Sequence, residues 1–193
     1  SMKTILSKEN IAKAIQEVNK GTVSGRDGFT TDFYAKSGVK EPMVDHLHAL
    51  FWEVEQSGKM TDAMREATIS VLFKGRPKDD RAVCKSYRPI SITPAEYRIL
   101  MKAVQRKLQG AVASVVGTTQ LAYLSDGRRL HDSTLLMAET ARMLEQEGRA
   151  GAIVQVDNTA AFDRVRWDFM HEVMEAMQFP HAFRMFMRTV YTD

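Results

Sequence analysis

The chain has 193 residues, with 44% hydrophobic and 26% charged residues, which is an ordinary globular composition with nothing that argues for disorder. The formal net charge of +3 permits an anionic partner without demanding one. The single cysteine, Cys84, excludes an internal disulfide and a cysteine-rich zinc site, and favours a reducing intracellular compartment, cytoplasm or nucleus. No apolar run approaches the length of a membrane span.

Apolar residues at helical spacing predict two helices in the amino-terminal part. The first follows Ser7 and stops before Gly21, and the second covers residues 41–57 and ends at Gly58. Between them, residues 21–34 are rich in glycine and aromatic side chains, which favours a packed connection. The residues expected on the buried faces are Ile11, Ala14, Ile15 and Val18 in the first helix, and Met43, Leu47, Leu50, Phe51 and Val54 in the second.

A hairpin and a helix are predicted next. Residues 67–74 alternate between apolar and polar side chains, and residues 87–92 resume this β character after a charged loop. A loop of this length predicts an antiparallel hairpin with Lys74 and Arg88 near one another at its base. Thr93-Pro94-Ala95-Glu96 predicts a helix start with Thr93 as cap and Glu96 in the capping-box position, and we expect this helix to continue past Gly110.

The carboxyl-terminal part is predicted to hold three helices and one buried strand. Asp132 can cap a helix that ends at Gly148, and its Leu135, Leu136, Met143 and Leu144 are expected to face the core. The apolar run within residues 151–156 predicts a buried strand. Residues 167–177 and a segment from Phe183 to Tyr191 complete the helices, and the elements together predict an α+β fold.

Asp157 stands at the end of this predicted strand. An unpaired carboxylate next to a buried strand needs a metal ion, a partner charge or a cap. For a lone aspartate the ordinary interpretation is a turn cap, with Asp163 starting the helix that carries Trp167. The whole string from residue 155 to 165, QVDNTAAFDRV, favours a different interpretation.

VDNTAAFDRV resembles the first catalytic motif of reverse transcriptases, in the D-x-x-x-AFD-x-V form of the non-LTR (LINE-type) retrotransposon enzymes. The resemblance implies that Asp157 is catalytic and is the first metal-binding aspartate, and that the backbone carbonyl of Asn158 also binds metal. It implies that Phe162 lies beneath the sugar of the incoming nucleotide and that Asp163 is structural. The alternative for Phe162 is a core aromatic that packs the strand against the Trp167 helix.

Further strings fit the same family in the family's order. Residues 86–91 match SYRPIS of the second fingers strand, and Tyr97-Arg98-Ile99-Leu100 continues it. Looser resemblances cover the amino-terminal extension motif (residues 24–34), the first fingers strand (69–74), a Q-x-GF-x-PGR-x-x-HD string (120–132) and the helical segment after the first catalytic motif (169–193).

The resemblance implies an RNA-directed DNA polymerase that transfers deoxynucleotides to a primer 3′ end with two Mg²⁺ ions. Its partners would be template RNA, a DNA primer and deoxynucleoside triphosphates. Residues 1–66 would form amino-terminal extension helices, 67–150 the fingers of a right-hand polymerase, and 151–193 the first part of the palm.

By the same resemblance Lys74 and Arg88 grip the triphosphate, Arg88 with its planar fork and Lys74 as a point charge. Each has an ordinary alternative. Lys74 is then an exposed charge at a strand end, and Arg88 forms an ion pair with a loop acid such as Asp79 or Asp80.

The sequence contains no Y-x-DD string, which in the family supplies the other two catalytic aspartates. We therefore expect an amino-terminal fragment, inactive alone, whose incomplete palm favours self-association. A second interpretation is a catalytically inert polymerase-like module that binds RNA or assembles protein.

Overall fold

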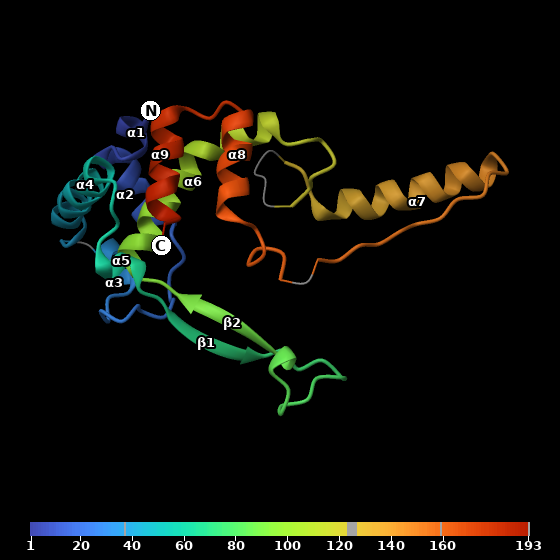
Figure 1. Cartoon of the computed structure of the whole chain (residues 1–193), viewed down its shortest axis with the longest axis horizontal. Coiled ribbons are helices and arrows are strands. Elements are labelled where there is room, and N and C mark those ends of the chain that lie inside the picture. The colour runs from blue at the N-terminus through green and yellow to red at the C-terminus, as the bar shows by residue number, and fades with distance from the viewer. Residues whose placement is uncertain (37, 123–126, 159, 193) are drawn as a thin grey trace. The chain divides into compact units, whose positions relative to one another are not determined.

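The computed structural model describes residues 1–36, 38–122, 127–158 and 160–192. In these residues the chain forms helices and a two-stranded antiparallel sheet, which is compatible with the predicted α+β class (Figure 1). Tyr123 and Ser125 of the predicted 120–132 string, Thr159 of the catalytic string and Asp193 lie outside the described residues. No helix in the described part is both long enough and apolar enough to cross a bilayer.

The chain divides into two compact units, Ser1–Arg106 with Pro180–Asp193, and Lys107–Phe179. These units group residues by their contacts and not by the parts of a polymerase. The predicted boundaries at residues 67 and 151, between the extension helices, the fingers and the palm, therefore stay a prediction. The first unit contains the hairpin and the helices α1 (Met2–Ile5), α2 (Lys8–Glu17), α3 (Thr31–Ala35), α4 (Lys40–Ser57), α5 (Asp62–Arg65), α9 (His181–Val190) and the start of α6 (Ala95–Val115).

The two predicted amino-terminal helices are confirmed as α2 and α4. The backbone N–H of Asn10 donates to Ser7 Oγ (3.3 Å), which caps α2. Gly58 ends α4 with a φ of +65°, a backbone conformation that favours glycine. The apolar faces of both helices lie in the core, where the fully buried side chains include Ile11, Ile15, Leu47, Phe51 and Val54.

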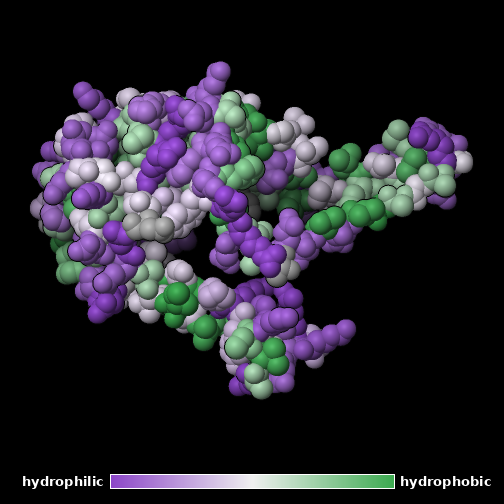
Figure 2. All heavy atoms as spheres, in the orientation of Figure 1, coloured by the Kyte–Doolittle hydropathy of each residue, from purple (hydrophilic) through white to green (hydrophobic). Residues whose placement is uncertain are grey.

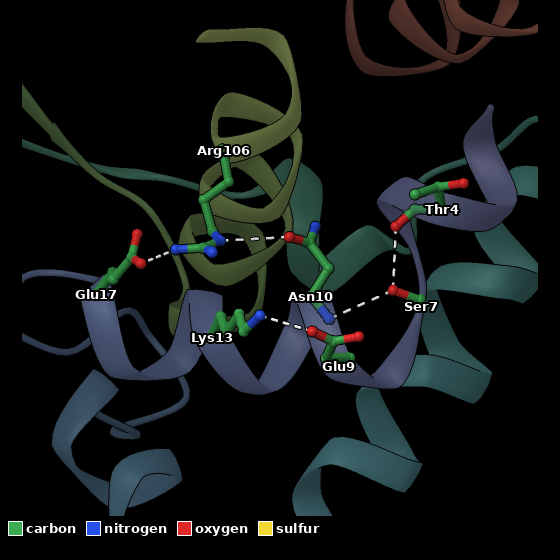
Figure 3. Close-up of polar contacts among 7 residues, drawn as sticks. All are labelled: Thr4, Ser7, Glu9, Asn10, Lys13, Glu17 and Arg106. Carbon is green, nitrogen blue, oxygen red and sulfur yellow. Dashed lines mark hydrogen bonds and ion pairs between the residues drawn. The ribbon is translucent and has the colours of Figure 1, made fainter. Parts of the chain in front are cut away.

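A buried amide joins α2 to the start of α6. Asn10 Nδ2 donates to the carbonyl of Ile5 (2.7 Å) and to that of Ala103 in α6 (2.9 Å). Arg106 Nε donates to Asn10 Oδ1 (3.3 Å), and the Arg106 guanidinium pairs with Glu17 at the end of α2 (Figure 3). The amide is 98% buried by relative area, and its donors and acceptor are all used, so burying it costs little.

The start of α6 also holds the connection over residues 21–35. Tyr34 Oη donates to Glu96 Oε1 (2.9 Å), so Glu96 bonds to α3 and does not form the predicted capping box. Arg98 donates to Thr22 Oγ1 (2.6 Å) and to the carbonyl of Val23 (3.0 Å). These hydrogen bonds hold the connection against α6, but it is only partly packed, because Tyr34 is buried whereas Phe29 and Phe33 are exposed.

The predicted hairpin is confirmed as β1 (Thr68–Phe73) and β2 (Tyr87–Ile92), paired antiparallel from Thr68 opposite Ile92 to Phe73 opposite Tyr87. Figure 1 shows the two strands extending away from the helices of the first unit. Both faces of the hairpin carry exposed apolar side chains: Ile69, Val71, Leu72 and Ile90. Figure 2 shows hydrophobic surface over the hairpin.

The second unit contains α7 (Leu130–Gln146) and α8 (Trp167–Ala176). Asp132 was predicted to cap α7, but this prediction is wrong, because the N-cap residue is Arg129. Asp132 lies in the first turn, where its Oδ2 accepts from the Arg129 backbone N–H (2.9 Å). The expectation that the apolar face of α7 is buried is wrong, because Leu135 is 67% exposed and no described residue of α7 is buried (Figure 2). Helical spacing identifies an apolar face but not an element that covers it.

The predicted buried strand at residues 151–156 is also wrong. These residues have no strand structure, and Val154 is 81% exposed. A strand needs hydrogen bonds from a neighbouring strand, and in the described residues only β1 and β2 pair. The central palm strand of the predicted fold is therefore absent from this part of the structure.

The tyrosine–glutamate contact predicts a fall of stability at high pH. Burial, and then the charge of Glu96 and the hydrogen bond to it, raise the pKa of Tyr34 above its ordinary value of 10.0. Because the folded pKa exceeds the unfolded one, the stabilisation is complete below pH 10 and is lost as the pH rises above it. Urea unfolding at pH 8 to 11 should show this decline, and Tyr34→Phe should make it shallower. An unchanged decline in Tyr34→Phe would contradict the assignment.

The close approach of the residue 21–35 connection to α6 gives a second prediction. A Cβ at Gly25 would lie 2.8 Å from Pro94 Cα, whereas a Cβ at Gly110, inside α6, would meet nothing within 4 Å. Gly25→Ala should therefore destabilise the chain by about 1–3 kcal/mol. The matched control Gly110→Ala should stabilise it by about 0.5–1 kcal/mol through helix propensity. Chemical denaturation measures both, and equal effects would refute the close contact.

Candidate nucleotide-binding and catalytic residues

Lys74 and Arg88 lie on the same face of the hairpin, next to its loop. Arg88 stands opposite Leu72, and the Lys74 backbone N–H donates to the Ser86 carbonyl (2.9 Å), which extends the ladder beyond β1. Side chains two residues apart on a strand share a face, so the register brings the two cations to the same side. Lys74 Nζ donates to the Lys85 carbonyl, and the Arg88 side chain is exposed.

The loop between the strands is held by its own side chains. Ser86 Oγ is buried and accepts from the Asp80 backbone N–H (3.0 Å). Tyr87 Oη donates to the Arg81 carbonyl (3.0 Å). The Arg81 guanidinium lies over the Phe73 ring, 5.3 Å from its centroid, which favours a cation–π contact. These contacts fix the conformation of the loop and so the positions of its charged residues.

This segment concentrates positive charge. Residues 74–88 contain six lysines and arginines and two aspartates, whereas the whole chain has a formal net charge of only +3. Both aspartates bond to the loop backbone, because Asp79 Oδ2 accepts from Arg76 N–H (2.8 Å) and Asp80 Oδ1 from Ala82 N–H (2.9 Å). Among the described residues no carboxylate pairs with Arg88, so the alternative of an ion pair with Asp79 or Asp80 is not realised. The hairpin surface suits a polyanion.

The catalytic-motif residues lie in the irregular segment between α7 and α8, in the second unit. Asp157 and Asn158 are exposed, and Phe162 is 80% exposed, which excludes a core role for its ring in this unit. A turn follows, in which the Arg164 N–H donates to the Ala160 carbonyl (3.2 Å). Ala160 has a φ of +53°, in a region that L-residues adopt at a cost of about 1–3 kcal/mol and that often marks functional segments.

Within the part of the chain that the structure describes, the donor set around Asp157 does not make a metal site by itself. Among the described residues, no three histidine, cysteine, aspartate or glutamate side chains lie together in a group that could hold a metal ion. Magnesium sites of polymerases need more than one carboxylate. One aspartate and one backbone carbonyl can contribute ligands but cannot complete the coordination shell.

Two arginines of this segment, Arg164 and Arg166, were not singled out from the sequence. Asn158, Arg164, Arg166 and Phe169 line a hollow of about 350 Å³. Arg166 forms a forked contact with Asp168, which lowers the pKa of that exposed carboxyl, first through the Arg166 hydrogen bond and then through the Phe169 backbone N–H. The alternation Arg164-Val165-Arg166, at the end of the motif string, is the signal that could have identified them.

Comparison with known proteins gives two matches. Residues 76–192 match the sequence model of a family described as reverse transcriptase (RNA-dependent DNA polymerase). All of this chain aligns with the "Transposon TX1 uncharacterized 149 kDa protein" of Xenopus laevis, with 25% identity over 192 residues. The chain spans 14% of the length of that relative. Both matches bear out the family that the motifs predicted.

Proposed function

The chain belongs to the reverse transcriptase family, and on that premise we propose that it supplies the nucleotide-gripping hairpin and the first catalytic aspartate of an RNA-directed DNA polymerase. The observation that carries the proposal is the hairpin, where residues 74–88 hold six cations and only two aspartates, both of which bond to the loop backbone. A triphosphate is the polyanion that a polymerase must hold near its catalytic carboxylates.

Each predicted site residue has a place in this proposal. Lys74 and Arg88, on one face of the hairpin, contact the phosphates of the incoming deoxynucleotide. Asp157 and the carbonyl of Asn158 are one part of a two-magnesium site, and reverse transcriptases generally use divalent metals. The remaining carboxylates must come from a Y-x-DD hairpin outside this sequence. Template RNA and a DNA primer are the macromolecular partners.

A second candidate function is a catalytically inert module that binds RNA or assembles protein. The exposed apolar side chains of the hairpin and α7 favour it, because large apolar surfaces are usually covered by a partner. Self-association through these surfaces is part of this candidate function.

The chain alone should not incorporate nucleotides on a primed RNA template, because Asp157 cannot hold both metal ions without further carboxylates. A longer form that continues into a Y-x-DD hairpin should incorporate them, and Asp157→Ala should abolish that activity. Primer extension measures both forms. An inactive longer form that still binds RNA would support the inert module. Primer extension by the chain alone would refute the proposal that part of the catalytic site lies outside this sequence.

The triphosphate contact is tested in the same longer form. Lys74→Ala or Arg88→Ala should raise the KM for deoxynucleotides about tenfold or more, because each removes a charge-assisted hydrogen bond. Template affinity should change little. Lys59→Ala, on an exposed lysine outside the hairpin, is the matched control and should leave both quantities unchanged. Loss of template binding before nucleotide use would assign the hairpin to the template instead.

Phe162 is proposed as the residue that excludes ribonucleotides. A rigid ring beneath the sugar leaves no room for a 2′-hydroxyl, so Phe162→Val should admit ribonucleotides while largely preserving deoxynucleotide incorporation. Since the ring is 80% exposed, this variant should not cost the roughly 3 kcal/mol or more of a buried aromatic. Primer extension with each nucleotide type, beside a thermal melt, gives the answer. A proportional loss of incorporation for both nucleotide types would refute the proposal that Phe162 excludes ribonucleotides.

A further inference from the structure

A pocket of about 600 Å³ lies in the first unit, between the end of α2 and the first turns of α6. It shares no residue with the hairpin or with the catalytic segment. Polar and aromatic side chains line much of it: Asn19, Thr22, Tyr97, Arg98, Lys102 and Gln105. This volume is within the range of small-ligand sites in proteins.

Two cations on α6 line the pocket. Arg98 is held in place by its hydrogen bonds to Thr22 Oγ1 (2.6 Å) and to the Val23 carbonyl (3.0 Å), which use two of its five N–H donors. Lys102, one turn further along, donates to Gln105 Oε1 (3.2 Å) and is half-buried. A fixed guanidinium beside an ammonium is an arrangement that favours a phosphate group.

The carboxylate at the edge of the pocket does not cancel this charge. Glu17 lines the pocket but pairs with Arg106, which also donates to Asn10 (Figure 3). Arg106 thus neutralises Glu17, and the charges of Arg98 and Lys102 remain. The amides of Asn19 and Gln105 and the hydroxyl of Thr22 supply neutral hydrogen-bonding groups around them.

We propose that this pocket binds a phosphate group, with Arg98 and Lys102 as its cationic ligands. The expected source of the phosphate is an RNA strand, whose backbone would contact the first unit away from the hairpin. This choice of source rests on the proposed function, which the inference deepens. Tyr97 gives the pocket an aromatic side chain on which a base of that strand can lie. A free polyphosphate carries the same chemistry and is the other source.

Methionine-methyl NMR can read this pocket separately from the hairpin, because Met101 lines it. The Met101 signal, assigned with Met101→Leu, is followed while the full chain is titrated with tripolyphosphate or with a short single-stranded RNA at low ionic strength. A shift with RNA assigns a nucleic-acid backbone, and a shift with tripolyphosphate alone assigns a free polyphosphate. No shift with either probe would overturn the proposal.

Substitutions that each remove one positive charge distinguish a specific phosphate site from general electrostatic attraction of an anion to the chain. Lys102→Gln should weaken the binding seen at Met101 about tenfold, and Lys102→Arg should restore most of it. Lys107→Gln removes the same charge from an exposed position of α6 outside the pocket and should leave the affinity nearly unchanged. Equal weakening by both glutamine variants would overturn the proposal. Nucleotide incorporation is not needed for this readout, so a failure of the polymerase assignment is detected separately.

Discussion

The buried amide of Asn10 is the interaction on which the first unit depends. It bonds at once to the carbonyl that ends α1 and to a carbonyl in α6, and Arg106 satisfies its oxygen. A buried amide without partners costs several kcal/mol, so α1, α2 and α6 must keep the arrangement that satisfies it. The start of α6 in turn holds the residue 21–35 connection and follows directly on β2. One side chain of α2 thus ties α1 and α2 to the helix that directly follows the hairpin.

Much of the first unit could be predicted because its signals are local. Ser7 caps α2 and Gly58 ends α4, and each acts within one turn of its own helix. The hairpin followed from the alternation in residues 67–74 and from the second β segment after the charged loop. The family followed from the order of several short strings, and the comparisons confirm it as the reverse transcriptase family.

The second unit could not be predicted in the same way, because its expected elements require partners from elsewhere. The apolar run at Ile153 to Val156 has the composition of a strand, but composition supplies no neighbour for its backbone hydrogen bonds. Leu135 and Leu136 mark the apolar face of α7, yet no described element covers that face. The roles of Asp157 and Phe162 stay predictions for a related reason: an aspartate and an aromatic ring acquire those roles only beside further carboxylates and a nucleotide.

The exposed thiol of Cys84 lies in the short 3₁₀ turn Cys84–Ser86, next to β2 and to the cations of the hairpin loop. As the only cysteine of the chain, it can form a disulfide only with another molecule. Air oxidation would then couple two chains through their hairpin loops. A covalent pair made in this way would resemble a native dimer on a sizing column. Reductant, or Cys84→Ser, separates the two cases.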